Sequence, residues 1–455
     1  MFTQSKNPYE VMEVNHDLVQ QFSEGYIDFL NKCKTEREVF DYCVNVLNQN
    51  GFELFDNSKN YGIGDKIYFT NRNKSVSACV IGADDLWNGV NIIASHIDSP
   101  RLDLKVNPIH EDSQFAMLRT HYYGGIKKYQ WTTIPLSLRG TVVTTTGKIE
   151  LNLGNEDDDF GFTITDLLPH LASEQYEKKL NKAIEAENLQ VIVGTVPDNT
   201  AEKKKVKANL LKLLKDNYGI EEEDFVSADL SFVPAFKAKS IGFDKSLVGG
   251  YGQDDRVCAY ASLMSFLELS NLNKTAFLWL ADKEEIGSEG NTGVQSSFFY
   301  NSIYSIAKSV NNIADYVDLT HVLSSSKCLS ADVNAGFDPL YKSVHEKSNA
   351  SQINHGVILT KFTGRGGKSG SSDSGAEFLG YLRILFNNNN IAWQVGELGK
   401  IDIGGGGTVA KFIANHNVDV IDVGVSILSM HSPYEVSSKL DIYESYKAYK
   451  AFYEA

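Results

Sequence analysis

Several polar side chains directly follow apolar, strand-like runs of this chain, and their types suit a hydrolytic metal centre. His96 ends one such run, and Glu284 and Glu285 come directly after another. Imidazole nitrogen combined with carboxylate oxygen is the donor set of hydrolytic zinc and its neighbours. Because ligands gather at the carboxyl ends of strands in open α/β sheets, these side chains are expected to meet around two metal ions. The candidate metal ligands are His96, Asp254, Glu285, Asp332 and His431.

The pair His96 and Asp98 is a compact signal of its own. A metal-bound imidazole needs a hydrogen bond at its second nitrogen to fix the tautomer, and a carboxylate two residues away can supply it or brace the loop. An ordinary buried histidine near a strand end would have the same local sequence. The pair therefore favours a metal site only in combination with the other candidate ligands.

The adjacent carboxylates of Glu284 and Glu285 can take two different roles. Neighbouring side chains after a strand point in different directions, so one can bind metal while the other faces the attacking water as a base. A solvated acidic turn is the alternative. Against it, the pair ends an intensely apolar run, and an uncharged Ile286-Gly-Ser segment follows.

The remaining candidates are each ambiguous alone. Asp254 follows a glycine-rich stretch and could cap the helix that begins there, and Asp255 competes with it as the ligand. Asp332 could merely start a turn, and His431 could be a packing histidine. Their joint occurrence at strand ends is what favours a two-metal hydrolase.

The elements that would position these residues read as an α/β domain. From Asp254 onward a helix at 254–270 precedes a strand at 275–281, and a buried strand at 418–427 runs toward His431. This order predicts a catalytic domain built on a mixed sheet with helices on both faces.

A long gap separates the first candidate ligand, His96, from the second, Asp254. Residues 101–152 read as antiparallel strands, and residues 201–217 form an amphipathic helix whose lysines are a solvated face. An inserted domain explains this composition best. The predicted division is a discontinuous catalytic domain, residues 1–100 and 238–455, and an inserted β-rich domain, residues 101–237.

Bulk properties exclude several classes of partner. At 455 residues the chain exceeds what one core covers, and its net charge of −15 argues against nucleic acid or an anionic membrane as a general partner. No signal peptide and no membrane-spanning apolar run is visible. The five cysteines lack a Cys-x-x-Cys pair, which predicts reduced thiols, a cytoplasmic location and no thiolate metal site.

A glycine-rich segment ends in Gly407 and Thr408. No Gly-Lys-Ser/Thr follows it, so it is not a phosphate-binding P-loop. Close approach of a substrate backbone to Gly407 and Thr408 fits better.

In chain order, the motifs His96-Ile-Asp-Ser-Pro, Gln253-Asp-Asp-Arg, Asp282-Lys-Glu-Glu-Ile-Gly-Ser and Ser429-Met-His-Ser closely resemble the aminopeptidase I / aspartyl aminopeptidase family of zinc metallopeptidases. The similarity spans essentially the whole chain and is strongest toward the bacterial aminopeptidase 1 branch. It implies a zinc exopeptidase-like fold and two divalent metal ions, zinc with cobalt or manganese as replacements. The implied roles are Asp254 as bridging ligand, His96 and Asp332 at one metal, Glu285 and His431 at the other, Glu284 as general base, and Asp98 orienting His96.

The family's interleaved domain carries a Pro-His-Leu, matched here at Pro169-His170-Leu171. In such enzymes this histidine reaches the active site of a neighbouring subunit. The resemblance therefore implies a catalytic part for His170, a dimerisation role for the inserted domain, and a homo-oligomer built of dimers, commonly a dodecamer.

One departure from the family concerns specificity. The acid-preferring branch places histidines after the metal-binding aspartate, whereas this chain has Asn334-Ala-Gly-Phe-Asp. Lys361, Arg365 or Lys368 could still meet an acidic side chain, but a broader or neutral preference is expected. The predicted function is removal of the N-terminal residue from peptides with a free N-terminus.

Two alternatives remain at this level. A two-metal carboxypeptidase or amidohydrolase would need a cation for the substrate carboxylate, and Arg256 or Arg365 could serve. A non-catalytic, metal-stabilised assembly or cargo-binding protein is the other, although it has no use for a base beside the ligands.

Overall fold

The computed structural model describes residues 6–311 and 315–455. The chain forms two compact units. Unit 1 comprises the residues up to Asp98, Ala238–Met430 and Tyr434–Ala455, and unit 2 comprises Ser99–Lys237 and His431–Pro433.

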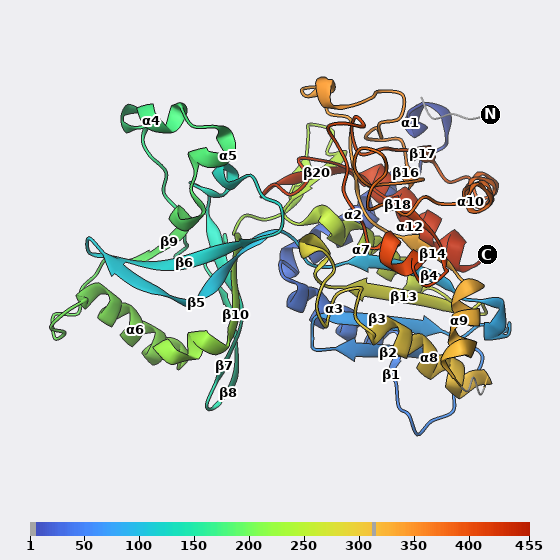
Figure 1. Ribbon diagram of the computed structural model, residues 1–455, viewed down its shortest axis with the longest axis horizontal. Coiled ribbons are helices and arrows are strands. Elements are labelled where there is room, and N and C mark those ends of the chain that lie inside the picture. Colours follow the sequence, from blue (N-terminus) through green and yellow to red (C-terminus); the bar gives the residue numbers. More distant parts are fainter. Residues whose placement is uncertain (1–5, 312–314) are drawn as a thin grey trace. The chain divides into compact units, whose positions relative to one another are not determined.

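Unit 1 is built on a nine-stranded mixed sheet (Figure 1). The central strands β13, β4, β14 and β18 run parallel, while β3 and β16 flank them in the antiparallel sense. This mixed α/β architecture confirms the predicted fold class. In spatial order the strands are β1 (Glu53–Leu54), β2 (Lys66–Asn71), β3 (Ser75–Val80), β13 (Ala276–Ala281), β4 (Asn91–His96), β14 (Lys327–Ser330), β18 (Asp419–Gly424), β16 (Val357–Thr360) and β17 (Trp393–Val395).

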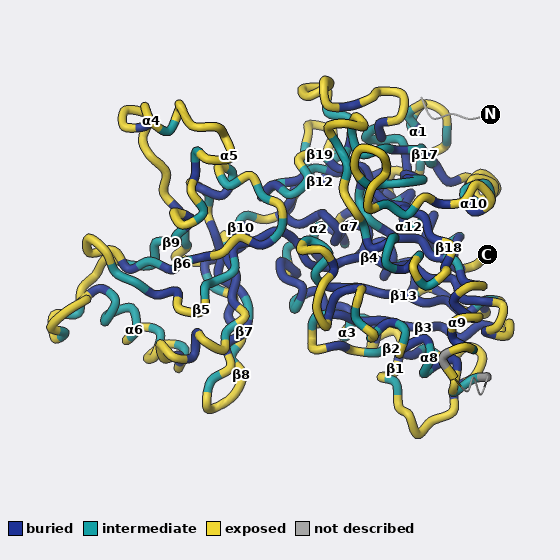
Figure 2. Tube along the Cα trace, in the orientation of Figure 1, coloured by how far each residue is buried: buried dark blue, intermediate teal, exposed yellow. Residues whose placement is uncertain are grey.

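Helices cover both faces of this sheet because successive strand side chains point to opposite sides. Ile93 and Leu278 enter one hydrophobic core, whereas their neighbours Ile92 and Trp279 enter the other. Figure 2 shows the central strands buried along their length. The first face carries α2 (His16–Lys32), α3 (Glu36–Gln49), α7 (Gln253–Leu267), α10 (Ala376–Asn388) and α12 (Lys439–Tyr453); the second carries α8 (Phe298–Asn311), α9 (Tyr316–Ser324) and α11 (Ala410–Ala414).

A smaller five-stranded sheet completes unit 1 and corrects one prediction. The apolar run 418–427 is not a single strand: β18 ends at Gly424 and β19 begins at Ser426 in the other sheet. Apolar character continues across the break because both strands are buried, so periodicity alone cannot locate it. The order is β11 (Lys239–Ile241), β12 (Leu247–Gly250), β20 (Glu435–Ser438), β19 (Ser426–Leu428) and β15 (Asn334–Ala335), and the short helix α1 spans Pro8–Val11.

Unit 2 contains a six-stranded antiparallel sheet. Its long helix α6 (Lys205–Tyr218) starts later than the predicted residue 201, since Lys204 has a left-handed backbone. In order the strands are β8 (Gly147–Leu153), β7 (Leu136–Thr144), β10 (Ala228–Pro234), β5 (Arg101–Asp112), β6 (Phe115–Tyr123) and β9 (Gln190–Gly194), with short helices α4 (Ser173–Tyr176) and α5 (Leu180–Ala183). Within the described residues of the chain, no helix is long and apolar enough to cross a membrane.

Candidate metal centre

Parallel strands bring the first candidate ligands to one edge of the large sheet. His96 is the last residue of β4, and Ala281, the last residue of β13, pairs with it. On the other side, Ser330 of β14 pairs with Ala94, which places Asp332 just beyond the same edge. The strand ends thus bring these candidate ligands to the edge where open α/β sheets bind ligands.

The carboxylates of the acidic pair lie directly beyond β13. Glu284 and Glu285 occupy the first positions of a 3₁₀ turn, Glu284–Ile286, whose preceding residue Lys283 has a left-handed backbone with φ of 68°. Only Asp282 and Lys283 connect the strand to the pair. The left-handed backbone of Lys283 therefore separates the strand from the turn that carries the acidic pair.

Asp254 is held at the start of α7 by a residue that the sequence did not single out. Glu435 of β20 is 1% exposed, and its Oε2 accepts the amides of Gln253 at 2.6 Å and Asp254 at 3.1 Å. Asp254 and Asp255 have non-helical backbone angles, and the peptide bond between them is cis. No motif near Glu435 indicated this contact, because the partners meet only in the folded chain.

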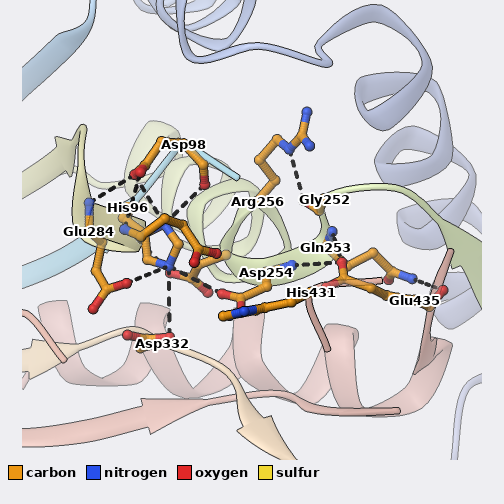
Figure 3. A network of polar contacts seen from close by, with 12 residues as sticks. His96, Asp98, Gly252, Gln253, Asp254, Arg256, Glu284, Asp332, His431 and Glu435 are labelled. Atoms are coloured by element: carbon orange, nitrogen blue, oxygen red, sulfur yellow. Dashed lines mark hydrogen bonds and ion pairs between the residues drawn. The ribbon is translucent and has the colours of Figure 1, made fainter. Parts of the chain in front are cut away.

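Three carboxylates converge on one nitrogen of His96 (Figure 3). Its Nε2 lies 3.2 Å from Asp254 Oδ1, 3.9 Å from Glu284 Oε2 and 4.0 Å from Asp332 Oδ1. Donor atoms of His96, Asp254 and Glu285 lie within 4.8 Å of one another. A second set with the same spread contains His96, Asp255 and Asp332, so Asp255 is grouped here as well.

Asp98 supports both sides of this cluster. His96 Nδ1 lies 3.3 Å from its carboxylate and 3.1 Å from its carbonyl oxygen, and a proton on Nδ1 leaves Nε2 free to bind a cation. The same carboxylate accepts the backbone amides of Glu284 at 3.1 Å and Glu285 at 3.2 Å. Asp98 thus orients the imidazole and also braces the loop of the acidic pair.

The electrostatics of the cluster favour a bound cation. Burial, together with the charge of Asp255, raises the pKa of Asp332 well above its ordinary value, and burial raises the pKa of Asp255 too. For His96, burial lowers the pKa, but hydrogen bonds to Asp254 and Asp98 outweigh it and raise the pKa well above 6.5.

Both the charge and the donor chemistry of these residues show whether they fit a divalent cation. Asp255 Oδ1 is buried without a hydrogen-bond partner in the part of the chain that the structure describes. Like charges this close in a buried site are costly unless a cation compensates them. One imidazole and several carboxylate oxygens suit zinc, cobalt or manganese, so these residues fit a divalent metal.

Two predicted histidines belong to unit 2. His431 Nδ1 lies 2.8 Å from the carbonyl oxygen of Gly125, which would fix the tautomer that leaves Nε2 for a metal. His431 belongs to neither of the two donor clusters around His96, and its part as a ligand stays a prediction. His170 lies in the 3₁₀ turn Pro169–Leu171 and lines a cavity of about 950 Å³ within unit 2.

The predicted substrate-binding residues lie in loops beyond β16 and before α11. Lys361 forms an ion pair with Asp373 at 2.7 Å, and Lys368 contacts the same carboxylate at 2.9 Å. Thr408 Oγ1 accepts the amide of Ala410 at the start of α11. Nearby, the amide of Gly364 donates to Gly406 at 2.6 Å, and a Cβ on Gly407 would lie 3.5 Å from Gly370. The two glycine-rich segments therefore support each other.

Comparison with known proteins identifies the family of this chain. Residues 29–453 match the family model described as aminopeptidase I zinc metalloprotease (M18). A probable M18 family aminopeptidase 1 of Borreliella afzelii (strain PKo) is 48% identical over 457 aligned positions, covering 99% of each chain. The crystal structure of an M18 family aminopeptidase from Thermotoga maritima has a TM-score of 0.94 at 43% identity and covers 99% of each chain.

More distant structures share the fold alone. The mApe1 dodecamer of S. cerevisiae is 21% identical to this chain, with a TM-score of 0.76 and 96% of each chain covered. At this identity the likeness concerns architecture and does not transfer the assembly.

Asp98→Asn tests whether the contacts of Asp98 support the metal-binding cluster. The amide group would replace one acceptor by a donor facing a backbone N–H, so we expect affinity for zinc to fall about 10-fold to 100-fold. Competition with a chromophoric chelator measures this change. Asp419→Asn, at an exposed position on β18, is the matched control and should bind zinc as the wild type does. Equal affinity in all three proteins would contradict the assigned role of Asp98.

Proposed function

Since the chain belongs to the aminopeptidase I zinc metalloprotease (M18) family, we propose that it removes the N-terminal residue of peptides at a dinuclear metal centre. The observation that carries the proposal is the approach of three carboxylates to His96 Nε2 within 4.0 Å. The resemblance to the family assigns Asp254 as the bridging ligand, and its Oδ1 lies 3.2 Å from that nitrogen. The other proposed ligands are His96, Asp332, Glu285 and His431.

Two divalent cations held by these side chains would supply the activation of water, whose pKa falls toward about 7 on such ions, and the polarisation of the scissile carbonyl. The protein's own contribution is to hold the donors in place. His96 keeps one tautomer through Asp98, and Asp254 is fixed through the contacts of its amide. These contacts hold His96 and Asp254 in place before the cations bind, which favours catalysis by preorganisation.

Glu284 is the residue we assign as general base. Its side chain is 18% exposed, whereas the side chain of Asp98 is 0% exposed, so Glu284 can meet solvent water and substrate. It would take a proton from the attacking water and then give that proton to the nitrogen of the leaving peptide, so that the C–N bond breaks with no net proton change. Its amide bond to Asp98 fixes where the carboxylate starts.

Terminal cleavage follows from the negative charge of the site. A substrate ammonium group would lie beside carboxylates that are already in excess, and an internal residue of a peptide offers no such charge. Substrates with a blocked N-terminus should therefore be poor.

Glu284→Gln separates metal binding from turnover. The amide cannot accept the proton, so we expect zinc content to stay at the wild-type level while kcat on leucyl reporter substrates falls at least 1,000-fold, within the span of about 10² to 10⁴ typical of general-base catalysis. Metal analysis and steady-state kinetics on the same preparation measure both. A variant that retains wild-type kcat would remove Glu284 from this role. A wild type that binds zinc but cleaves no aminoacyl substrate would contradict the proposed function.

We further propose a preference for neutral N-terminal residues. Lys361 directly follows Thr360, whose hydroxyl accepts from Asn334, two positions after Asp332. Asp373 engages both Lys361 and Lys368, and these lysines lower the pKa of its carboxyl group. The pairing reduces the positive charge available to an acidic substrate side chain.

Asp373→Asn therefore should shift the preference. Removing one exposed negative charge near the substrate is expected to raise kcat/KM for glutamyl and aspartyl reporters about threefold to fivefold, because of weaker repulsion in a well-hydrated loop. The value for leucyl reporters should stay within about twofold. Asp419→Asn again controls for a general change in net charge. An unchanged ratio of glutamyl to leucyl turnover would refute the assignment.

Unit 2 is proposed to join copies of the chain. Its segment around His170 exposes apolar side chains, among them Leu171 at 68% exposure, Tyr176 and Leu180. Several exposed apolar side chains in one segment are typical of a protein interface. We propose that a second copy covers this segment and that His170 of one copy reaches the active site of the other, in an assembly of dimers up to a dodecamer.

Leu171→Glu tests this interface. A buried charge would weaken association, so light scattering should show a lower mass than the wild type, and kcat should fall with it. Leu213→Glu, an exposed leucine of α6, is the control expected to keep the wild-type mass. Unchanged mass and activity in Leu171→Glu would exclude this segment as the contact.

A further inference from the structure

We propose that Thr292 and Lys283 are positioning residues that, with Asp282, close the loop carrying Glu284 and Glu285 and so set the direction of both carboxylates. The inference rests on the proposed function, because it concerns the same metal centre. None of the three side chains is a proposed metal ligand.

The loop is closed at its base by two hydrogen bonds between the same two residues. The amide of Asp282 donates to the carbonyl of Thr292 at 3.3 Å, and Thr292 Oγ1 donates to Asp282 Oδ2 at 2.6 Å. Both residues are 2% exposed. The residues between Asp282 and Thr292 thus form a compact loop whose two ends are joined. The shape of such a loop depends on this closure.

Lys283 fixes which groups donate and which accept in these hydrogen bonds. Its Nζ donates to Thr292 Oγ1 at 2.8 Å and lies 3.6 Å from Asp282 Oδ2. An ammonium group only donates, so the hydroxyl must accept from it and turn its single proton toward Asp282. A charged group stands at each end of this chain, which makes both hydrogen bonds stronger than neutral ones.

The backbone beside the closure is strained. Lys283 and Ser288 both have left-handed backbones, with φ of 68° and 61°. The amide of Ser288 donates to the carbonyl of Lys283 at 2.7 Å. Such conformations persist only where the surroundings hold them, and Lys283 immediately precedes Glu284. The contacts of Lys283 therefore decide where the carboxylates point.

Like charges surround Asp282 at the base of the loop. Burial, and then the charges of Glu36 on α3 and of Asp98, raise the pKa of Asp282 to about 6. Lys74 lies 3.4 Å from Glu36, and Lys283 and Thr292 face Asp282 from the loop. Asp98 holds the amides of the acidic pair, and the base of the loop stays beside Asp98 because Thr292 and Lys283 offset the repulsion.

Thr292→Val and Thr292→Ser form the test. Valine keeps the shape but loses the donor and the acceptor, whereas serine keeps both. We expect Thr292→Val to lower kcat on leucyl reporters about 10-fold to 30-fold with KM within twofold, and to lose zinc to a chelator about 10-fold more readily. Thr292→Ser should stay within twofold of wild type in each measurement.

Wild-type kcat and zinc retention in Thr292→Val would overturn the inference. An equal loss of kcat and of zinc in Thr292→Ser would also overturn it, because it would point to packing and not to the hydrogen bonds. If Thr292→Val does not fold, Lys283→Met replaces it, since it keeps the aliphatic stem; the same loss of kcat is expected, and wild-type kcat would overturn the inference. Failure of the wild type to cleave any aminoacyl reporter would count against the proposed function instead, because this inference concerns only the difference between variants.

Discussion

The Nε2 atom of His96 lies within 4.0 Å of carboxylates from three separate segments, and those carboxylates repel one another in a buried site. The polypeptide has to hold like charges together before any cation arrives. Desolvation makes this arrangement unstable by itself, and divalent cations are the groups that relieve it. The positions of the supporting residues follow from this constraint, because each of them restrains a carboxylate that would otherwise move away.

Two kinds of support occur around the cluster. His96 ends β4 and Asp332 follows β14, so parallel, deeply buried strands place both residues. The acidic pair and Asp254 come from a loop and a helix start, where the backbone is bent and free to vary. There the restraint comes from other buried acids, which accept backbone amides at the positions that must not move. In the proposed site, acidic residues would thus serve both as donors to the metal and as the groups that hold those donors.

The sequence predicted those parts of the fold that depend on local pattern. The mixed sheet with helices on both faces is confirmed, and so is membership of the aminopeptidase family. Both rest on short-range information: alternating burial along strands, apolar spacing along helices, and ordered motifs. The single strand expected at 418–427 is wrong, because a buried strand that changes sheets keeps the same apolar composition on both sides of the break.

The sequence by itself determined the chemistry of the donors, since the residue types and their places at strand ends are local properties. Only the tertiary structure decided which carboxylates surround His96, that Asp255 is grouped with Asp332, and that Glu435 fixes Asp254. Glu435 and Asp254 are 181 positions apart, and Asp98 and Glu284 are 186 apart. Contacts over such separations depend on how sheets and helices pack as a whole, and a local pattern of residues carries no record of that packing.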